Sequence, residues 1–200
     1  MKRLMDLALS LSALALAGPP MLLLALLVRL TSPGPALFHQ ARLGLHGRPF
    51  HLLKFRTMYV NSPDIRNPDG SAFSGASDPR VTPIGGFMRR TSLDELPQLI
   101  NVLAGDMSLV GPRPDLVDQL AYYSETEKAK LLVKPGITGL AQIGGRNSIS
   151  WSERKALEVQ YVSRQSLALD LKIVLLTVPC VLRSRGINTG SGPGPGHSKP

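Results

Sequence analysis

The sequence contains a single cysteine, Cys180, and few aromatic residues. One cysteine excludes an internal disulfide and any zinc site built from several cysteines. Aromatic residues make up only 5% of the chain, too few for the stacking surfaces that bind single-stranded nucleic acid, so we expect no nucleic-acid partner. Acidic residues are also scarce: 23 lysines and arginines face 14 aspartates and glutamates, a net charge of +9. This excess indicates an anionic partner: phosphate ligands, anionic lipid or, by charge alone, nucleic acid.

Several common catalytic motifs are missing as well. The sequence has no GxxxxGK[ST] phosphate loop, no GxSxG nucleophile motif, no HExxH zinc motif and no Asp-x-Asp pair. His39, His46 and His51 are not at metal-ligand spacing, and we interpret them as surface or strand residues. A length of 200 residues allows one domain with a short anchor and a tail.

A long uncharged segment runs from Leu7 to Val28, about 33 Å as a continuous helix and enough to cross a bilayer. A cleaved signal peptide is disfavoured because the apolar run continues past the A-x-A patterns. A spanning helix remains open, and so does a helix that breaks at Gly18-Pro19-Pro20 and returns to the face it entered. Both flanks are basic, which leans mildly toward re-entry because basic flanks favour the cytoplasmic side.

The remaining sequence predicts a small, helix-rich α/β (α+β) domain with short strands and many loops. The predicted elements are a strand at 50–60, a long loop at 61–83, helices at 96–103, 124–133, 150–164 and 167–183, and a disordered tail at 186–200. The helix at 124–133 begins with a capping box of Ser124 and Glu127. The last helix is nearly apolar, so it is either a core helix or one that lies in the membrane interface.

The most informative patch contains two neighbouring carboxylates, Asp94 and Glu95. One interpretation is simple helix initiation, with Ser92 and Glu95 as a capping box. Pro97 fits this poorly because proline prefers the first helical position, so the helix could begin there and leave both carboxylates just before it. A carboxylate in such a place can bind Mg²⁺ or attack phosphorus to form an acyl phosphate.

Cations accompany this pair in four separate segments. Each segment alone could be an ordinary solvated surface, but together with the carboxylates they predict a phosphate-rich ligand. The candidates are Arg89 before the carboxylates, Arg113 held between two prolines, Lys54 and Arg56 on one strand face, and Arg146 in a glycine-rich turn.

At these residues the chain resembles the bacterial sugar transferase family, the monotopic phosphoglycosyl transferases. The resemblance covers most of residues 1–185. The matching stretches are Lys2-Arg3-x-x-Asp6, Ser32-Pro33-Gly34-Pro35, Phe38-x-Gln40-x-Arg42-x-Gly44, Lys54-Phe55-Arg56-Thr57-Met58, Thr91 to Gln98, Asn101 to Pro114, Lys134 to Gly139, and Gly145-Arg146-Asn147.

The resemblance implies a re-entrant anchor at 1–30, a catalytic domain at 31–185 and a tail at 186–200, on the cytoplasmic face of the inner membrane. It implies transfer of a phosphosugar from a UDP-sugar to polyprenyl (undecaprenyl) phosphate with release of UMP, as the first membrane step of glycan assembly. Asp94 would form the covalent intermediate and bind Mg²⁺, and Glu95 would assist as base or organiser. The expected phosphate-binding residues are Lys54, Arg56, Arg89, Arg113 and Arg146.

Two alternatives come from other classes. A membrane-tethered basic protein could bind acidic lipid or nucleic acid without catalysis and would not need Asp94. A one-step enzyme could use Asp94 only to hold metal. The sequence leaves open the transferred sugar and the oligomeric state, a homodimer included.

Overall fold

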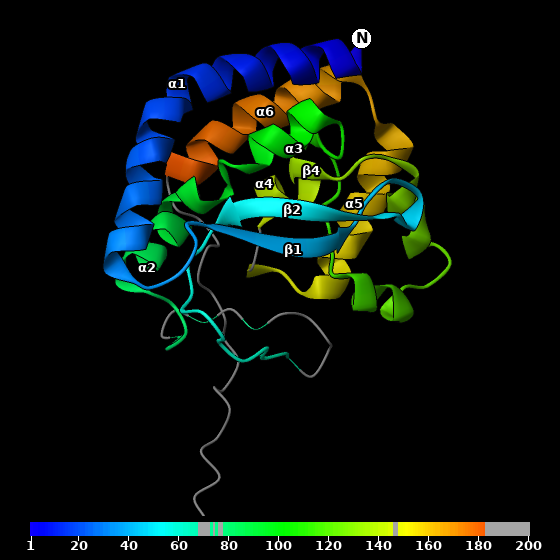
Figure 1. The fold of residues 1–200 in the computed structure, drawn as a ribbon. Coiled ribbons are helices and arrows are strands. Elements are labelled where there is room, and N and C mark those ends of the chain that lie inside the picture. Colours follow the sequence, from blue (N-terminus) through cyan, green and yellow to red (C-terminus); the bar gives the residue numbers. More distant parts are fainter. Residues whose placement is uncertain (68–72, 74, 76–77, 146–147, 183–200) are drawn as a thin grey trace, which may run out of the picture.

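The computed structural model describes residues 1–182 except 68–72, 74, 76–77 and 146–147 (Figure 1). It is the helix-rich α/β domain with short strands that the sequence predicts. Its α-helices are α1 (Lys2–Thr31), α2 (Pro83–Thr91), α3 (Gln98–Ala104), α4 (Leu140–Gly144), α5 (Trp151–Arg164) and α6 (Leu167–Leu182). The short 3₁₀-helices are η1 (Leu45–Gly47), η2 (Leu93–Glu95), η3 (Val117–Tyr122) and η4 (Glu127–Leu132). The strands are β1 (Leu37–Leu43), β2 (Pro49–Phe55), β3 (Ser108–Val110) and β4 (Gly136–Thr138).

Strands β1 and β2 form an antiparallel hairpin whose register pairs Leu37 with Phe55. Buried side chains of β2 pack against α3 and its following turn, where Leu52 contacts Val102 and Met107. The Asn101 side chain also joins α3 to β2: its Nδ2 donates to His51 O at 2.9 Å and its Oδ1 accepts from Leu53 N at 2.9 Å. The hairpin therefore fixes the position of α3.

The second sheet consists of β3 and β4, which run parallel and pair Ser108 with Gly136. Its core contains Val110, Tyr161 of α5 and Ile173 of α6, all fully buried. Figure 1 shows α6 lying beneath the first half of α1. The domain thus has two parts: the β1–β2 hairpin with α3, and the β3–β4 sheet with α5 and α6.

Helix α1 contains Pro19 and Pro20 and still continues as one helix from Lys2 to Thr31. The sequence predicted a break at Gly18-Pro19-Pro20, and no interruption of the helix is found there. Figure 1 shows instead that the axis of α1 bends between its two halves. Each proline lacks an N–H and crowds the preceding turn, which bends a helix without necessarily ending it.

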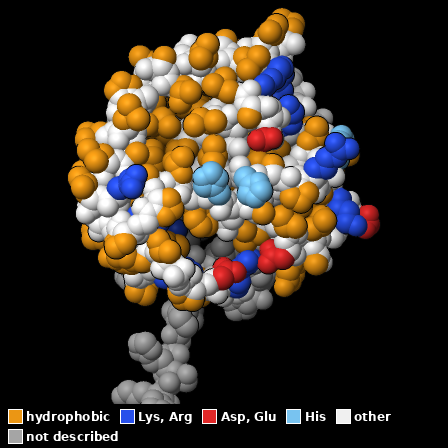
Figure 2. Space-filling model, in the orientation of Figure 1, with side chains coloured by type: hydrophobic (Ala, Val, Ile, Leu, Met, Phe, Trp, Pro, Cys, Tyr) orange, Lys and Arg blue, Asp and Glu red, His pale blue; other side chains and the backbone are white. Residues whose placement is uncertain are grey.

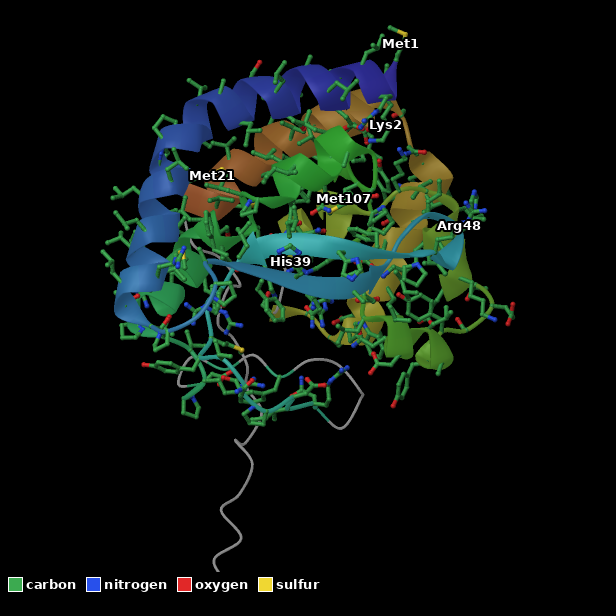
Figure 3. All side chains as sticks on the ribbon, in the orientation of Figure 1. Met1, Lys2, Met21, His39, Arg48 and Met107 are labelled. Carbon is green, nitrogen blue, oxygen red and sulfur yellow. The ribbon has the colours of Figure 1, made fainter. Side chains whose placement is uncertain are left out.

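Both ends of α1 are bonded to the rest of the domain. At the first turn, Lys2 Nζ lies 2.7 Å from Asp170 Oδ2 and donates to Val110 O, and Arg3 Nη2 donates to Leu103 O at 2.9 Å. Figure 3 shows Met1 pointing outward and Lys2 pointing into the domain. At the other end, Leu24 and Val28 are buried against Phe55 and Met88, and this cluster joins the second half of α1 to β2 and α2.

The outer face of α1 is apolar and exposed. The exposed side chains of α1 include Leu4, Leu11, Leu16, Leu22, Leu23, Leu26 and Leu30. Helix α6 also exposes apolar side chains: Leu171, Leu175 and Val178. Figure 2 shows hydrophobic side chains along α1 and most charged side chains of that view away from it. Among the described residues, α1 is the one helix long and apolar enough to cross a bilayer. A surface of this size and character indicates contact with lipid.

The helices predicted from the sequence lie within a few residues of α3, η4, α5 and α6, whereas β1, α2, β3, β4 and α4 were not predicted. Ser150 caps α5 through a capping box with Glu153, and the predicted box of Ser124 and Glu127 is confirmed, although η4 is 3₁₀ rather than α-helical. The predicted strand at 50–60 ends early, at Phe55. The tail at 186–200 lies outside the described residues.

Candidate active site around Asp94 and Glu95

Asp94 and Glu95 lie on η2, between α2 and α3. Ser92 has a φ of 57°, and its backbone N–H caps α2 by donating to Arg89 O and Met88 O. This left-handed residue ends α2 and turns the chain into η2, a strained conformation typical of functional sites. Because α3 begins at Gln98 with Pro97 as its N-cap, both carboxylates precede the helix. The Ser92 side chain makes no capping hydrogen bond to η2, so simple helix initiation does not explain the pair.

Asp94 is buried, with 9% of its surface exposed. Burial raises the pKa of Asp94 to about 7, and the neighbouring Glu95 carboxylate adds to this shift. The cations Lys54, Arg89 and Arg113 oppose it. Asp94 is thus a carboxylate of unusually high basicity, which makes its ionised form a stronger nucleophile.

Lys54 and Arg89 face Asp94 from different elements. Lys54 is on β2, and burial together with the nearby Arg42 lowers its pKa to about 8. Arg89 is on the last turn of α2, where its Nε donates to Thr57 Oγ1 at 3.1 Å. Gly85 allows this close packing, because a Cβ there would lie 2.1 Å from Thr57 O. Both predicted cations therefore surround the carboxylate.

Arg113 reaches Glu95 from the loop after β3. Its Nη2 donates to Glu95 Oε1 at 2.6 Å, and the guanidinium is partly exposed. The Glu95 carboxylate, with Asp94 adding to the effect, raises the pKa of Arg113 above its already high ordinary value. The structure thus brings Arg113 to the carboxylate pair, as the sequence analysis expected.

Arg56 does not join this cluster, and its expected position beside Lys54 is wrong. It follows the end of β2, so the strand alternation that would place it on the Lys54 face has stopped. It is buried, and its guanidinium donates to backbone carbonyls at the end of α1 and just beyond it: Val28, Ser32, Pro33, Gly34 and Pro35. Arg56 therefore fixes the segment that leads out of α1, Ser32 to Pro35, against the end of the helix. The fifth predicted cation, Arg146, lies outside the described residues.

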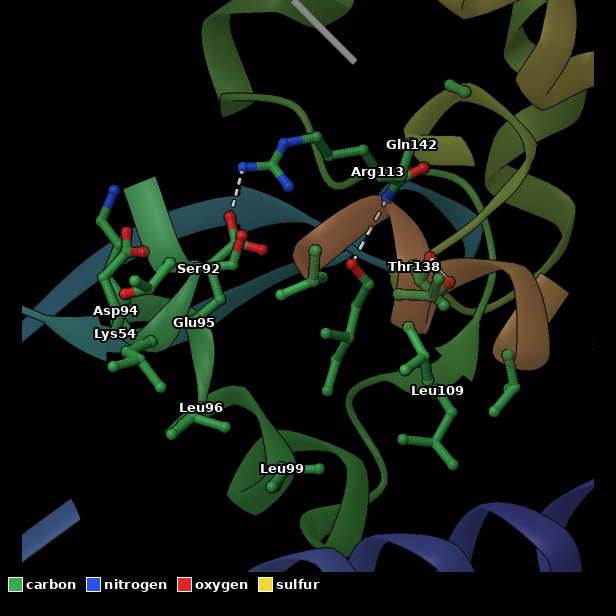
Figure 4. Close-up of a pocket in the computed structure, with 18 of the residues that line it drawn as sticks. Lys54, Ser92, Asp94, Glu95, Leu96, Leu99, Leu109, Arg113, Thr138 and Gln142 are labelled. Carbon is green, nitrogen blue, oxygen red and sulfur yellow. Dashed lines mark hydrogen bonds and ion pairs between the residues drawn. The ribbon is translucent and has the colours of Figure 1, made fainter. Parts of the chain in front are cut away.

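A cavity of about 730 Å³ opens beside these residues (Figure 4). One part of its wall is charged and consists of Lys54, Arg89, Asp94, Glu95 and Arg113. Another part is apolar and consists of Leu9 and Ala13 of α1, Leu96, Leu99, Leu109 and Ile137, and Val174, Val178 and Val181 of α6. The cavity can therefore hold a ligand that is anionic at one end and apolar at the other.

A third part of the wall comes from residues that the sequence analysis did not identify. They are Thr138, Gln142, Trp151, Arg154 and Glu158, from β4, α4 and α5. Figure 4 shows Gln142 and Thr138 on the side of the cavity opposite Asp94 and Lys54. Thr138 lies in the Lys134 to Gly139 stretch that carries the resemblance. No local motif marks the other four side chains, because they reach the cavity only through the packing of α4 and α5.

The carboxylates can be tested for a metal ion. Among the described residues, no group of three or more His, Cys, Asp or Glu side chains is arranged to hold one. Mg²⁺ commonly binds through one or two carboxylates plus substrate phosphates, and the Asp94–Glu95 pair fits this arrangement. A buried carboxylate beside three cations suits transfer of a phosphoryl group.

Comparison with known proteins agrees with this chemistry. Residues 1–184 match the family described as bacterial sugar transferase. The chain is 49% identical over 187 residues to an uncharacterised sugar transferase of Bacillus subtilis, EpsL, covering 94% of this chain and 90% of EpsL. It is 46% identical over 191 residues to a UDP-glucose:undecaprenyl-phosphate glucose-1-phosphate transferase of Caulobacter vibrioides, covering 90% and 69%. An Escherichia coli protein of the same description is 43% identical over 186 residues, covering 89% of this chain and 39% of that protein.

Proposed function

Because this chain belongs to the bacterial sugar transferase family, we propose that it transfers a phosphosugar from a UDP-sugar to polyprenyl phosphate and releases UMP. The descriptions of the Caulobacter and Escherichia relatives support this reaction. The observation that carries the proposal is the cavity, in which a buried carboxylate and three cations face a wall of apolar side chains. A phosphate on a long isoprenoid chain needs both surfaces. Such a transfer is the first membrane step in assembling a glycan.

The first half-reaction begins with Asp94. Its carboxylate oxygen attacks the sugar-bearing phosphorus of the UDP-sugar, the bond from that phosphorus to the bridging oxygen breaks, and UMP leaves with that oxygen. The product is a phosphosugar esterified to Asp94 as an acyl phosphate. Lys54, Arg89 and Arg113 hold the phosphate oxygens and stabilise the charge that develops on them.

The second half-reaction returns the enzyme to its starting state. An oxygen of polyprenyl phosphate attacks the same phosphorus, the bond to Asp94 breaks, and the free carboxylate is restored. Glu95 serves as a base for the incoming group or as an organiser of Arg113. Asp94 would hold Mg²⁺, which would supply positive charge to offset that of the diphosphate. This two-step exchange predicts ping-pong kinetics.

The anchor is the second part of the proposal. We infer that α1 dips into the membrane and returns to the same, cytoplasmic face of the inner membrane. The support is that Lys2 at one end, and the carbonyls bound by Arg56 at the other, are both held by the same domain. Two ends bonded to one small domain are difficult to reconcile with opposite sides of a bilayer. The apolar wall of the cavity would then face the lipid that carries the acceptor.

The reaction is tested by UMP release from a panel of UDP-sugars by the membrane-embedded protein with Mg²⁺, with and without polyprenyl phosphate. We expect lipid-dependent turnover with at least one sugar and, without lipid, one phosphosugar bound per active chain at Asp94. Turnover that persists in Asp94→Asn would refute the covalent step. No release by wild type, with UDP-sugar binding intact, would favour a binding protein without catalysis.

The anchor is tested by labelling with a membrane-impermeant thiol reagent. In a Cys180→Ser background, Leu4→Cys and Thr31→Cys report the two ends of α1, and Glu125→Cys marks the domain. Glu125 is a suitable marker because its side chain is largely exposed. We expect all three to react from the cytoplasmic side. Reaction of the two α1 positions from opposite sides would establish a spanning helix.

A further inference from the structure

The loop that carries Arg113 is held by its backbone. Pro112 and Pro114 have no N–H, so the amide of Arg113 is the one backbone donor of this tripeptide. It donates to Oε1 of Glu158, on α5, at 3.1 Å. Because the Arg113 guanidinium is partly exposed, its direction depends on this backbone and on the ion pair with Glu95.

Carbonyl groups of the same loop are bound from other elements. Gly136 N of β4 donates to Pro112 O at 2.8 Å. On the other side, Arg42 Nη1 of β1 donates to Pro114 O at 3.1 Å. With Glu158, these contacts attach the loop to β4, β1 and α5, so a shift of one attachment is passed to Arg113.

Glu158 is itself held by Lys130, whose ammonium bonds to it directly and also lies 2.8 Å from Asp115 Oδ2. Lys130 and Glu158 are both almost fully buried. Burial opposes the charge on Lys130, but the two carboxylates outweigh it and raise the pKa of Lys130 above its ordinary value. Lys130 therefore stays a cation, and its two carboxylate partners, of which Glu158 is buried, depend on it.

We propose that Glu158 and Lys130 are positioning residues for phosphosugar transfer: together they fix the backbone of residue 113 so that its guanidinium is directed at Glu95 and the donor phosphate. This inference rests on the proposed function. A misplacement of about 1 Å at such a group costs about 100-fold in rate, so a buried pair that acts through the position of Arg113 can control turnover.

The chain offers a matched control for this pair. Glu127 of η4 forms a second ion pair with α5, with Lys155 Nζ 2.8 Å from Glu127 Oε1, and Lys155 is also buried. None of its described contacts reaches residue 113. Glu158→Gln and Glu127→Gln thus make the same chemical change at neighbouring ion pairs. In wild type, one oxygen of Glu158 accepts from Arg113 N and the other accepts from Lys130. The amide of Glu158→Gln has a single oxygen and no negative charge, so it cannot make both contacts.

The experiment measures kcat/KM for UMP release and the thermal midpoint of each variant. We expect Glu158→Gln to lower kcat/KM by about 10-fold or more, Lys130→Met to act in the same direction, and Glu127→Gln to change it less than about twofold. The decisive measurement repeats Glu158→Gln in an Arg113→Ala background, where we expect it to have almost no further effect. Glu158→Asp keeps the charge but withdraws the carboxylate, and serves in the same cycle if Glu158→Gln does not fold.

Equal losses in the wild-type and Arg113→Ala backgrounds would overturn the proposal, because Glu158 would then act directly on the ligand or only on stability. An equal loss in Glu127→Gln would overturn it too. Absence of UMP release by wild type with any donor would instead refute the proposed function, and with it the step at which Arg113 acts.

Discussion

Glu95 Oε1 accepts a hydrogen bond from Arg113 Nη2 at 2.6 Å. Both residues line the cavity, Glu95 from η2 and Arg113 from the loop after β3. The carboxylate thus holds the arginine before any substrate is present. A donor phosphate that binds Arg113 must share or replace this partner. In the proposed mechanism, the pair therefore links donor binding to the state of Glu95, the neighbour of Asp94.

Glu95→Gln should separate binding from turnover. Without the competing carboxylate, Arg113 is freer to bind phosphate, so we expect KM for the UDP-sugar to stay the same or fall. Loss of the base or organiser should lower kcat by about 100-fold. Arg113→Ala should act oppositely on KM and raise it. Steady-state kinetics of UMP release check both, and a raised KM in Glu95→Gln would contradict this account.

Asp94→Asn should remove activity and increase stability. We expect UMP release to fall by at least about 1,000-fold and no phosphosugar adduct to form, while membrane association is unchanged. The pKa of Asp94 is higher in the folded than in the unfolded protein, so the folded state binds the proton more tightly. The free energy of unfolding therefore decreases as the pH rises toward about 7 and Asp94 ionises. The variant should therefore melt at a higher temperature than wild type at pH 8, with little difference near pH 4. An equal or lower melting temperature at pH 8 would contradict the burial argument.

The pH profile of the first half-reaction should be bell-shaped. Asp94 attacks as the ionised carboxylate, so kcat/KM should rise with pH up to its pKa of about 7. Lys54 binds phosphate as the cation, so activity should fall above its pKa of about 8. Lys54→Arg should move the descending limb to higher pH and leave the ascending limb in place. A descending limb that does not move in Lys54→Arg would exclude this lysine as its source.

Arg56→Met should act on stability rather than on substrate binding. The change removes the guanidinium donor from the carbonyls of Ser32 to Pro35, just after α1, and we expect it to destabilise the protein by on the order of 3 kcal/mol. Arg113→Met should have the opposite profile, with a lower kcat/KM and a nearly unchanged melting temperature. Thermal unfolding and kinetics on the same samples distinguish them. A raised KM without loss of stability in Arg56→Met would return Arg56 to the phosphate-binding residues.

Much of the fold follows from local signals in the sequence. The caps at Ser124 and Ser150, and the proline at Pro97, place three element boundaries within a few residues. The carboxylate pair was identified because two acidic residues before a helix, beside arginines, form a local pattern. These features depend on neighbours in the chain, which a single sequence displays directly.

The remainder depends on tertiary contacts that a single sequence does not display. Arg56 was assigned to the face of Lys54 by strand alternation, but its partners are carbonyls more than 20 positions earlier. Glu158 and Gln142 join the cavity only because α5 and α4 pack beside β4. The break expected at Pro19 is a bend, since the second half of the helix is held by packing of Leu24 and Val28.

Helix α1 is attached to the domain at both ends, and these attachments fix the distance between its ends. Lys2 holds one tip and Arg56 holds the other, and the 30 residues between them would measure about 45 Å if straight. The helix is longer than the distance between its two attached ends, and it accommodates the difference by bending near the prolines. Lengthening the helix by one turn should therefore move its middle farther from the line between its ends and leave both attached ends in place. In the proposed re-entrant arrangement, the number of residues in α1 therefore sets how deeply the helix enters the membrane.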